Sequence, residues 1–198
     1  MTIIQKGEAV RRVVIDAMLV IAIALSTGLG SALFALELSR NQGSMAIGPW
    51  TAAPEAGADN PYAATIAATT LDLPFGASEG IVFTARKDSH GDPLRGSCSY
   101  TIAGGAPESR LWTLTVYDAV NGLMANPASR TGFHSRELLW DSDGQFTITM
   151  SKSARPGNWI PTNAADRLVI VFRLYDTPLT TGLAAELDMP DITVEACQ

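Results

Sequence analysis

The longest uninterrupted apolar stretch in the chain covers residues 17–36, AMLVIAIALSTGLGSALFAL, and contains no charged side chain. A helix rises about 1.5 Å per residue, so this stretch spans about 30 Å, the thickness of the hydrocarbon core of a bilayer. The pattern therefore predicts a single transmembrane helix over residues 13–40.

The charges around this stretch predict its orientation. Lys6, Arg11 and Arg12 precede it, whereas the charges that follow it balance each other. Because cytoplasmic flanks are enriched in Lys and Arg, residues 1–12 are expected to form a cytoplasmic tail and the C-terminal part to be exported. Two alternatives stay open: a buried core helix, or a cleaved signal peptide, whose apolar core usually has only about 7–15 residues.

Small residues stand four positions apart within the stretch, as in the pairs Ala24/Gly28 and Ser26/Gly30. This spacing lets two membrane helices approach closely and would support a weak helix-mediated dimer. The alternative is that small residues are simply common in membrane helices.

The next segment, residues 41–60, is rich in Gly, Ala and Pro and is expected to be a linker between membrane and domain. Its one large side chain, Trp50, is interpreted as a docking point on the domain, with an interfacial aromatic as the alternative. Residues 61–70 are expected to form a short helix with Asn60 as its N-cap.

From Gly80 onwards the pattern changes to short β-branched and aromatic runs separated by turns rich in Gly, Pro, Asn and Asp. Residues 168–175, LVIVFRLY, are almost continuously apolar and predict the most buried strand, covered on both faces. The predicted strands are 81–86, 97–103, 111–117, 137–140, 145–151, 168–175 and 192–196. This pattern predicts an all-β fold, an antiparallel β-sandwich or jelly-roll-like domain over residues 61–198.

The charge balance bears on the class of partner. Fourteen Lys and Arg stand against twenty Asp and Glu, a net charge of −6, and the basic residues are scattered. Nucleic-acid binding needs clustered cations that neutralise phosphates, so no nucleic-acid partner is expected. The pattern also holds no recognisable metal or cofactor motif, and no cofactor is expected.

The two cysteines, Cys98 and Cys197, both lie in the part predicted to be exported. An even number of cysteines in an oxidising compartment favours a disulfide, which would join the C-terminus to an early strand. Two free thiols are the alternative.

Four motifs occur in order along the C-terminal part: RLWTLTVYD over 110–118, Asn126-Pro127, GNWIP over 157–161, and FRLYD over 172–176. In this order and spacing they resemble the domain of unknown function 1214 family, over about residues 75–198. The resemblance implies a β-rich sandwich and a bacterial source. Together with the predicted anchor, it gives the expectation of a bacterial inner-membrane protein with a periplasmic C-terminal domain. It implies no catalytic residue. In that family the domain is often the second half of a longer protein. In this chain the anchor and linker take the place of the first half.

One group of residues is the candidate site. Arg173 interrupts the most apolar strand, and a buried guanidinium needs a partner, for which Asp118 and Asp176 are candidates. One interpretation is a structural salt bridge at the strand ends. The other is a polar pocket with an aromatic wall, able to hold a carboxylate or a sugar. The residues of this candidate ligand site are Arg110, Asn158, Trp159, Arg173, Tyr175 and Asp176.

Candidate catalytic bases are few, because the only histidines are His90 and His134. Both are expected to lie in exposed loops, and no G-x-S-x-G nucleophile motif occurs in the chain. No catalytic residue is therefore assigned.

Two function hypotheses follow. The first is a single-pass, membrane-anchored envelope protein whose exported β-sandwich binds an envelope ligand or a protein partner. The alternative is an envelope hydrolase acting on glycans or esters, with its site near Arg110, Trp159 and Arg173 and with His134 as its only base.

Overall fold

The computed structural model describes residues 2–40, 45–52, 79–120, 122–124, 126, 128–163, 165–181 and 187–197. The chain divides into two units, Met1–Gln42 and Gly43–Gln198. The expected helix over residues 61–70 lies outside the described residues.

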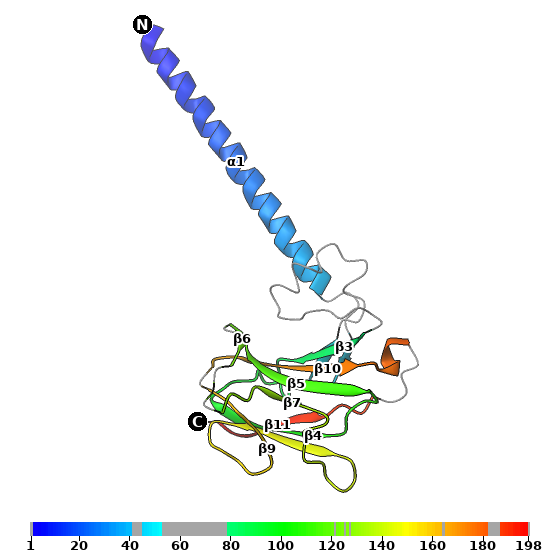
Figure 1. The fold of residues 1–198 in the computed structure, drawn as a ribbon. Coiled ribbons are helices and arrows are strands. Elements are labelled where there is room, and N and C mark those ends of the chain that lie inside the picture. Colours follow the sequence, from blue (N-terminus) through cyan, green and yellow to red (C-terminus); the bar gives the residue numbers. More distant parts are fainter. Residues whose placement is uncertain are drawn as a thin grey trace. The chain divides into compact units, whose positions relative to one another are not determined.

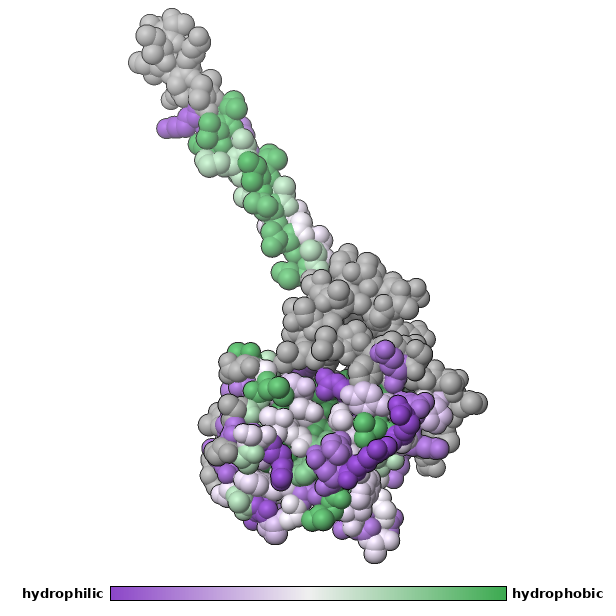
Figure 2. Space-filling view, in the orientation of Figure 1, coloured by the Kyte–Doolittle hydropathy of each residue, from purple (hydrophilic) through white to green (hydrophobic). Residues whose placement is uncertain are grey.

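The first unit is one long helix, α1 (Thr2–Arg40), which continues through the part expected to be a separate tail. Within it, Arg11–Ala35 is long and apolar enough to cross a membrane, with a mean hydropathy of 2.2. Large hydrophobic side chains are exposed along this part of α1 and cover much of the face seen in Figure 2. Gly, Ser and Thr interrupt them, and the hydroxyls of Ser26, Thr27 and Ser31 are satisfied by carbonyls of the preceding turn.

The second unit is a β-sandwich of two sheets, which confirms the predicted fold class (Figure 1). In the seven-stranded sheet the order is β1 (Met45–Ile47), β2 (Trp50–Ala52), β3 (Gly80–Ala85), β10 (Leu168–Tyr175) and β5 (Leu111–Asp118), with β6 (Gly122–Leu123) and β7 (Gly132–His134) both paired to β5. The four-stranded sheet has the order β11 (Asp191–Cys197), β4 (Cys98–Gly104), β8 (Phe146–Ser151) and β9 (Asn158–Pro161). A short 3-10 helix, η1 (Pro178–Thr181), follows β10. All pairs are antiparallel except β8 with β9.

Alternation along the strands decides which side chains enter the core. In β5, Trp112, Leu114 and Val116 are buried, and the residues between them are half-buried on the outer face. Strand β10 is buried from Leu168 to Phe172 on both faces, as predicted, and it is paired on both edges, with β3 and β5. Its outer face becomes half-exposed only at Arg173 and Tyr175.

The expected strand over residues 137–140 is not present. These residues form a connection from β7 to β8 in which only Trp140 makes an isolated bridge, to Phe146. A strand would need a continuous neighbour, and this segment crosses from one sheet to the other instead.

Trp50 is fully buried in the core, which confirms its predicted docking role. Its ring centroid lies 5.5 Å from that of Phe172, and its Nε1–H donates to the Pro190 carbonyl at 2.7 Å. The prediction that residues 41–60 form a linker is therefore wrong for residues 45–52, which form the β1–β2 hairpin and extend the large sheet. The short Gly-containing turn after Ile47 and the apolar Trp50 allow this segment to pair with β3.

Cys98 and Cys197 form the predicted disulfide. The two residues face each other in the register of β4 and β11. The bond therefore holds the last strand of the chain to the sheet, across 99 residues of sequence.

Candidate functional site

The outer face of the seven-stranded sheet carries one row of polar side chains across three strands. Strand pairing places Arg173 of β10 beside Thr113 of β5, and Thr113 beside His134 of β7. In the next row, Tyr175 lies beside Leu111. Because side chains alternate between the faces of a sheet, these five side chains all point away from the core.

An open groove of about 390 Å³ lies over this end of the sheet. Leu111 and Thr113 form its floor, and the aromatic ring of Tyr175 stands on one side. His134 and Arg136 line the other side, and Arg110 lines the end where β5 begins. The groove thus combines an apolar floor and an aromatic wall with two guanidinium groups.

Arg110 is ion-paired to Asp176, with 3.1 Å between Nε and Oδ2. The pair is 71% and 72% exposed, so water screens it and it is worth little stability. The backbones are also tied together, because the Arg110 N–H donates to the carbonyls of Tyr175 and Asp176. Asp176 has a φ of +51°, the left-handed region that Asp and Asn tolerate better than most residues.

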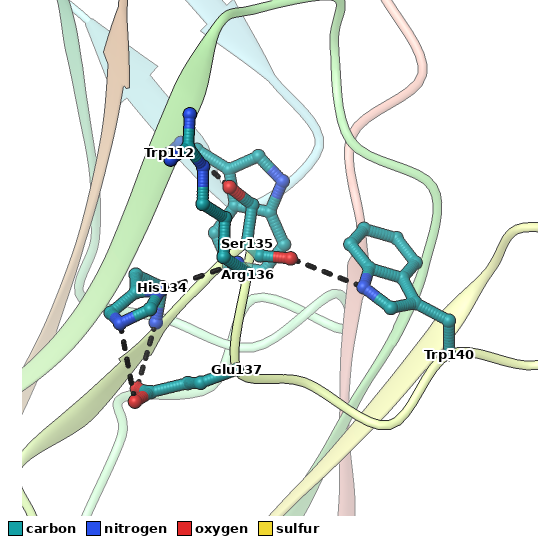
Figure 3. A network of polar contacts seen from close by, with 6 residues as sticks. All are labelled: Trp112, His134, Ser135, Arg136, Glu137 and Trp140. Atoms are coloured by element: carbon teal, nitrogen blue, oxygen red, sulfur yellow. Dashed lines mark hydrogen bonds and ion pairs between the residues drawn. The ribbon is translucent and has the colours of Figure 1, made fainter.

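His134 is held by its own chain segment at both ring nitrogens (Figure 3). Nδ1 accepts a hydrogen bond from the Arg136 N–H at 3.2 Å, and Nε2 lies 3.3 Å from the Glu137 carboxylate. In this geometry Nδ1 is an acceptor and Nε2 a donor. Both ring nitrogens are thus partnered by the residues that directly follow β7.

The segment from residue 135 to 140, hereafter the strap, connects the groove to the opposite sheet. Near the groove, the Ser135 N–H donates to the Trp112 carbonyl, and the Trp140 indole donates to the Ser135 carbonyl at 3.1 Å. The Trp140 ring lies edge-on to Trp112 (Figure 3). These contacts hold Arg136 and Glu137 at the rim.

The far end of the strap is clamped by the buried side chain of Asn158, in β9. Its Oδ1 accepts the Leu139 N–H at 2.8 Å, and its Nδ2 donates to the carbonyls of Leu139 at 2.9 Å and Thr147 at 3.0 Å. Every polar atom of this amide is therefore used inside the protein.

The six residues of the predicted ligand site do not form one pocket. Arg110 and Tyr175 line the groove, Asp176 pairs with Arg110, and Arg173 lies in the adjoining row. Trp159, by contrast, pairs with Thr149 on the outer face of the four-stranded sheet, and its indole donates to Ser151. The whole thickness of the sandwich separates Trp159 from the groove, because Trp159 points outward from the four-stranded sheet and the groove residues point outward from the seven-stranded sheet.

Arg173 has a different partner from the two carboxylates considered. Its Nη1 lies 3.5 Å from the Tyr117 hydroxyl, and the guanidinium lies 6.0 Å from the centre of the Tyr117 ring. Asp176 pairs with Arg110 instead. Asp118 lies opposite Leu168, five residues along β10 or about 16 Å away, and on the core face.

The predicted ligand site lacks four residues that line the groove: Leu111, Thr113, His134 and Arg136. His134 was expected in an exposed loop and was placed near the site only in the enzyme hypothesis; it lies half-buried in β7, and Arg136 was not considered. The signal was weak, because β7 has only three residues and its register against β5 cannot be read from the local sequence. An alternating Gly132, His134 and Arg136 on one face was the one available hint.

The chain belongs to the family described as protein of unknown function (DUF1214), whose model matches residues 79–179. A crystal structure of the VPA0106 protein from Vibrio parahaemolyticus is similar, with 27% identity and a TM-score of 0.54. The alignment covers 70% of this chain and 36% of that protein, so this chain spans about a third of the relative's length. An uncharacterised protein from Burkholderia cenocepacia aligns over 89% of this chain and 52% of its own, with 15% identity and a TM-score of 0.42. No curated protein matches the sequence.

Proposed function

We propose that this member of the DUF1214 family is a single-pass membrane protein whose β-sandwich binds a small envelope ligand in the groove over β5, β7 and β10. The observation that carries the proposal is the composition of the groove. Arg110 and Arg136 supply cationic hydrogen-bond donors, and Leu111 and Tyr175 supply an apolar floor and wall. Concave sites with an apolar lining and a few directed polar groups are typical of ligand sites.

Binding fits the groove better than catalysis does. The groove holds one histidine, and both of its nitrogens are engaged by the strap. The neighbouring Ser135 Oγ accepts from the Trp112 N–H at 3.4 Å and lies beside the strap backbone. A hydrolase near Arg110, Trp159 and Arg173 would also need Trp159, which faces away from the other two.

The membrane part of the proposal rests on α1, which is long and apolar enough to span a bilayer. We propose that its basic N-terminal end stays in the bacterial cytoplasm and that the sandwich is periplasmic. The Cys98–Cys197 disulfide supports the periplasmic location of the sandwich, because disulfides persist in oxidising compartments. An alkaline phosphatase fused after Gln198 is expected to be active. An inactive, protease-protected fusion would reverse the orientation. Helix-mediated dimerisation stays a prediction.

Native mass spectrometry of the full-length protein, gently extracted from its own membrane, tests the binding function. The wild-type protein is expected to carry extra mass from its ligand. Thr113→Tyr should remove that mass, because the new ring fills the floor of the groove. The matched control is Thr149→Tyr, which makes the same change on the outer face of the opposite sheet and should keep the mass. Bare wild-type protein, or equal loss in both variants, would contradict the proposal.

A further inference from the structure

The charges around the groove are not equally satisfied. Asp176 pairs with Arg110, and Glu137 pairs with His134. In the part of the chain that the structure describes, Arg136 has no carboxylate partner, although its side chain lines the groove. The groove therefore presents one guanidinium that is open to an anion and a second that already holds a carboxylate.

The carboxylate on Arg110 is held weakly. Both side chains of the Arg110–Asp176 pair are more than two-thirds exposed, and exposed ion pairs exchange with solvent at little cost. A ligand whose carboxylate reaches Arg110 from within the groove would share that groove with the guanidinium of Arg136 and the ring of Tyr175. Such a ligand gains contacts that the Asp176 carboxylate, at the end of β10, does not make.

We propose that the groove takes an organic acid, whose carboxylate displaces Asp176 from Arg110 while its flat apolar or sugar-ring body lies on Leu111 and Tyr175. In the free protein, the Asp176 carboxylate then occupies the position on Arg110 that the ligand carboxylate would take, and so competes with the ligand. The inference rests on the proposed binding function and adds the chemical class of the ligand. A guanidinium binds carboxylates through a planar fork of donors, and Arg110 already binds one in this place.

Asp176→Asn is the variant that separates competition from folding. Asn keeps the shape of the side chain and tolerates the φ of +51° at this position, but it has no charge with which to hold Arg110. Asp143→Asn is the matched control, because it removes the same charge from an exposed turn before β8. Tryptophan fluorescence should give the same unfolding midpoint for both variants and the wild type.

The probes are 4-fluorobenzoate and its neutral isostere 4-fluorobenzamide, titrated against the full-length protein in detergent and followed by ¹⁹F NMR. The benzoate is expected to bind, and the benzamide to bind at least about tenfold more weakly, because its amide has no negative charge and only one acceptor oxygen to offer a guanidinium. Asp176→Asn should tighten benzoate binding up to about fivefold, the range set by an exposed ion pair, and Asp143→Asn should leave it unchanged. Arg136→Gln should weaken benzoate binding, whereas Arg155→Gln, in an exposed loop, should not.

The double variant Arg110→Gln/Asp176→Asn distinguishes direct competition from a general change in charge. If Asp176 competes for Arg110, its substitution has no effect once Arg110 is replaced. Equal gains with and without Arg110, weaker benzoate binding by Asp176→Asn, or equal binding of the two probes would each overturn the inference. Absence of benzoate binding by both wild type and Asp176→Asn would also overturn it. The proposed function would still stand in that case if the ligand mass found by native spectrometry disappears in Thr113→Tyr.

Discussion

The side chain of Asn158 pairs with both backbone polar groups of Leu139, its Oδ1 2.8 Å from the N–H and its Nδ2 2.9 Å from the carbonyl. The amide thus acts as a strand neighbour for a single residue. Because Leu139 lies in the strap, this contact couples the four-stranded sheet to the rim of a groove on the other sheet.

Asn158→Asp tests this coupling. The carboxylate can still accept the Leu139 N–H, but it cannot donate to the carbonyls of Leu139 and Thr147 and would be a buried charge. We expect a loss of about 2–4 kcal/mol in the free energy of unfolding. Urea denaturation followed by tryptophan fluorescence measures it, since all four tryptophans lie in the sandwich.

The adjacent Trp159→Phe is the control, because it removes hydrogen bonds on the outer face without touching the strap. It should cost about 1 kcal/mol. Hydrogen exchange at the Leu139 amide should accelerate in Asn158→Asp alone. Equal exchange in the two variants would mean that Asn158 does not hold the strap.

Replacing both cysteines by serine should destabilise the sandwich by about 2–4 kcal/mol, because the disulfide closes a loop of 99 residues that is otherwise free in the unfolded chain. The urea midpoint of the wild type should fall to that of the double variant on addition of a reductant. The double variant itself should not respond to the reductant. An unchanged wild-type midpoint after confirmed reduction would show that strand pairing alone holds β11.

Substitutions of Trp50 measure how much the β1–β2 hairpin contributes to the stability of the sandwich. Trp50→Ala should lower the free energy of unfolding by about 3–5 kcal/mol, because it leaves a large cavity beside Phe172. Trp50→Phe keeps most of the ring contact and loses the bond to the buried Pro190 carbonyl, at about 1–3 kcal/mol. Wild-type stability in Trp50→Ala would mean that the hairpin does not support the sandwich.

Tyr100 makes stability depend on alkaline pH. Burial of the phenol raises the pKa of Tyr100 above its ordinary value, although the hydrogen bond from the Arg95 N–H opposes this. The unfolded chain then loses its proton at lower pH than the folded one. The contribution is complete below the unfolded pKa of about 10 and is lost as pH rises from there towards the folded pKa.

At pH 8, Tyr100→Phe should be about 1 kcal/mol less stable than the wild type, because the variant lacks the hydrogen bond from Arg95. Between pH 8 and pH 10.5, the free energy of unfolding should fall less in the variant than in the wild type. The free energy of unfolding at the two pH values is the measurement. Parallel losses in both proteins would assign the alkaline decline to other groups.

The sequence alone determined the features that depend on local pattern. An uncharged apolar run predicted α1, and the alternation in residues 111–117 and the continuous run in 168–175 predicted two central strands correctly. The disulfide and the burial of Trp50 also followed from residue type and position. These predictions succeed because hydrophobic burial and backbone periodicity act over a few residues.

The tertiary structure decided which side chains meet. Asp176 was a candidate partner of Arg173 but is ion-paired to Arg110. Trp159 lies on the outer face of the opposite sheet, and Arg173 contacts Tyr117. A shift of one residue in strand register moves a side chain to the other face, and the register is set by long-range pairing. The groove exists because β7 pairs with β5 and places His134 beside Thr113, a relationship that no local pattern in residues 132–134 encodes.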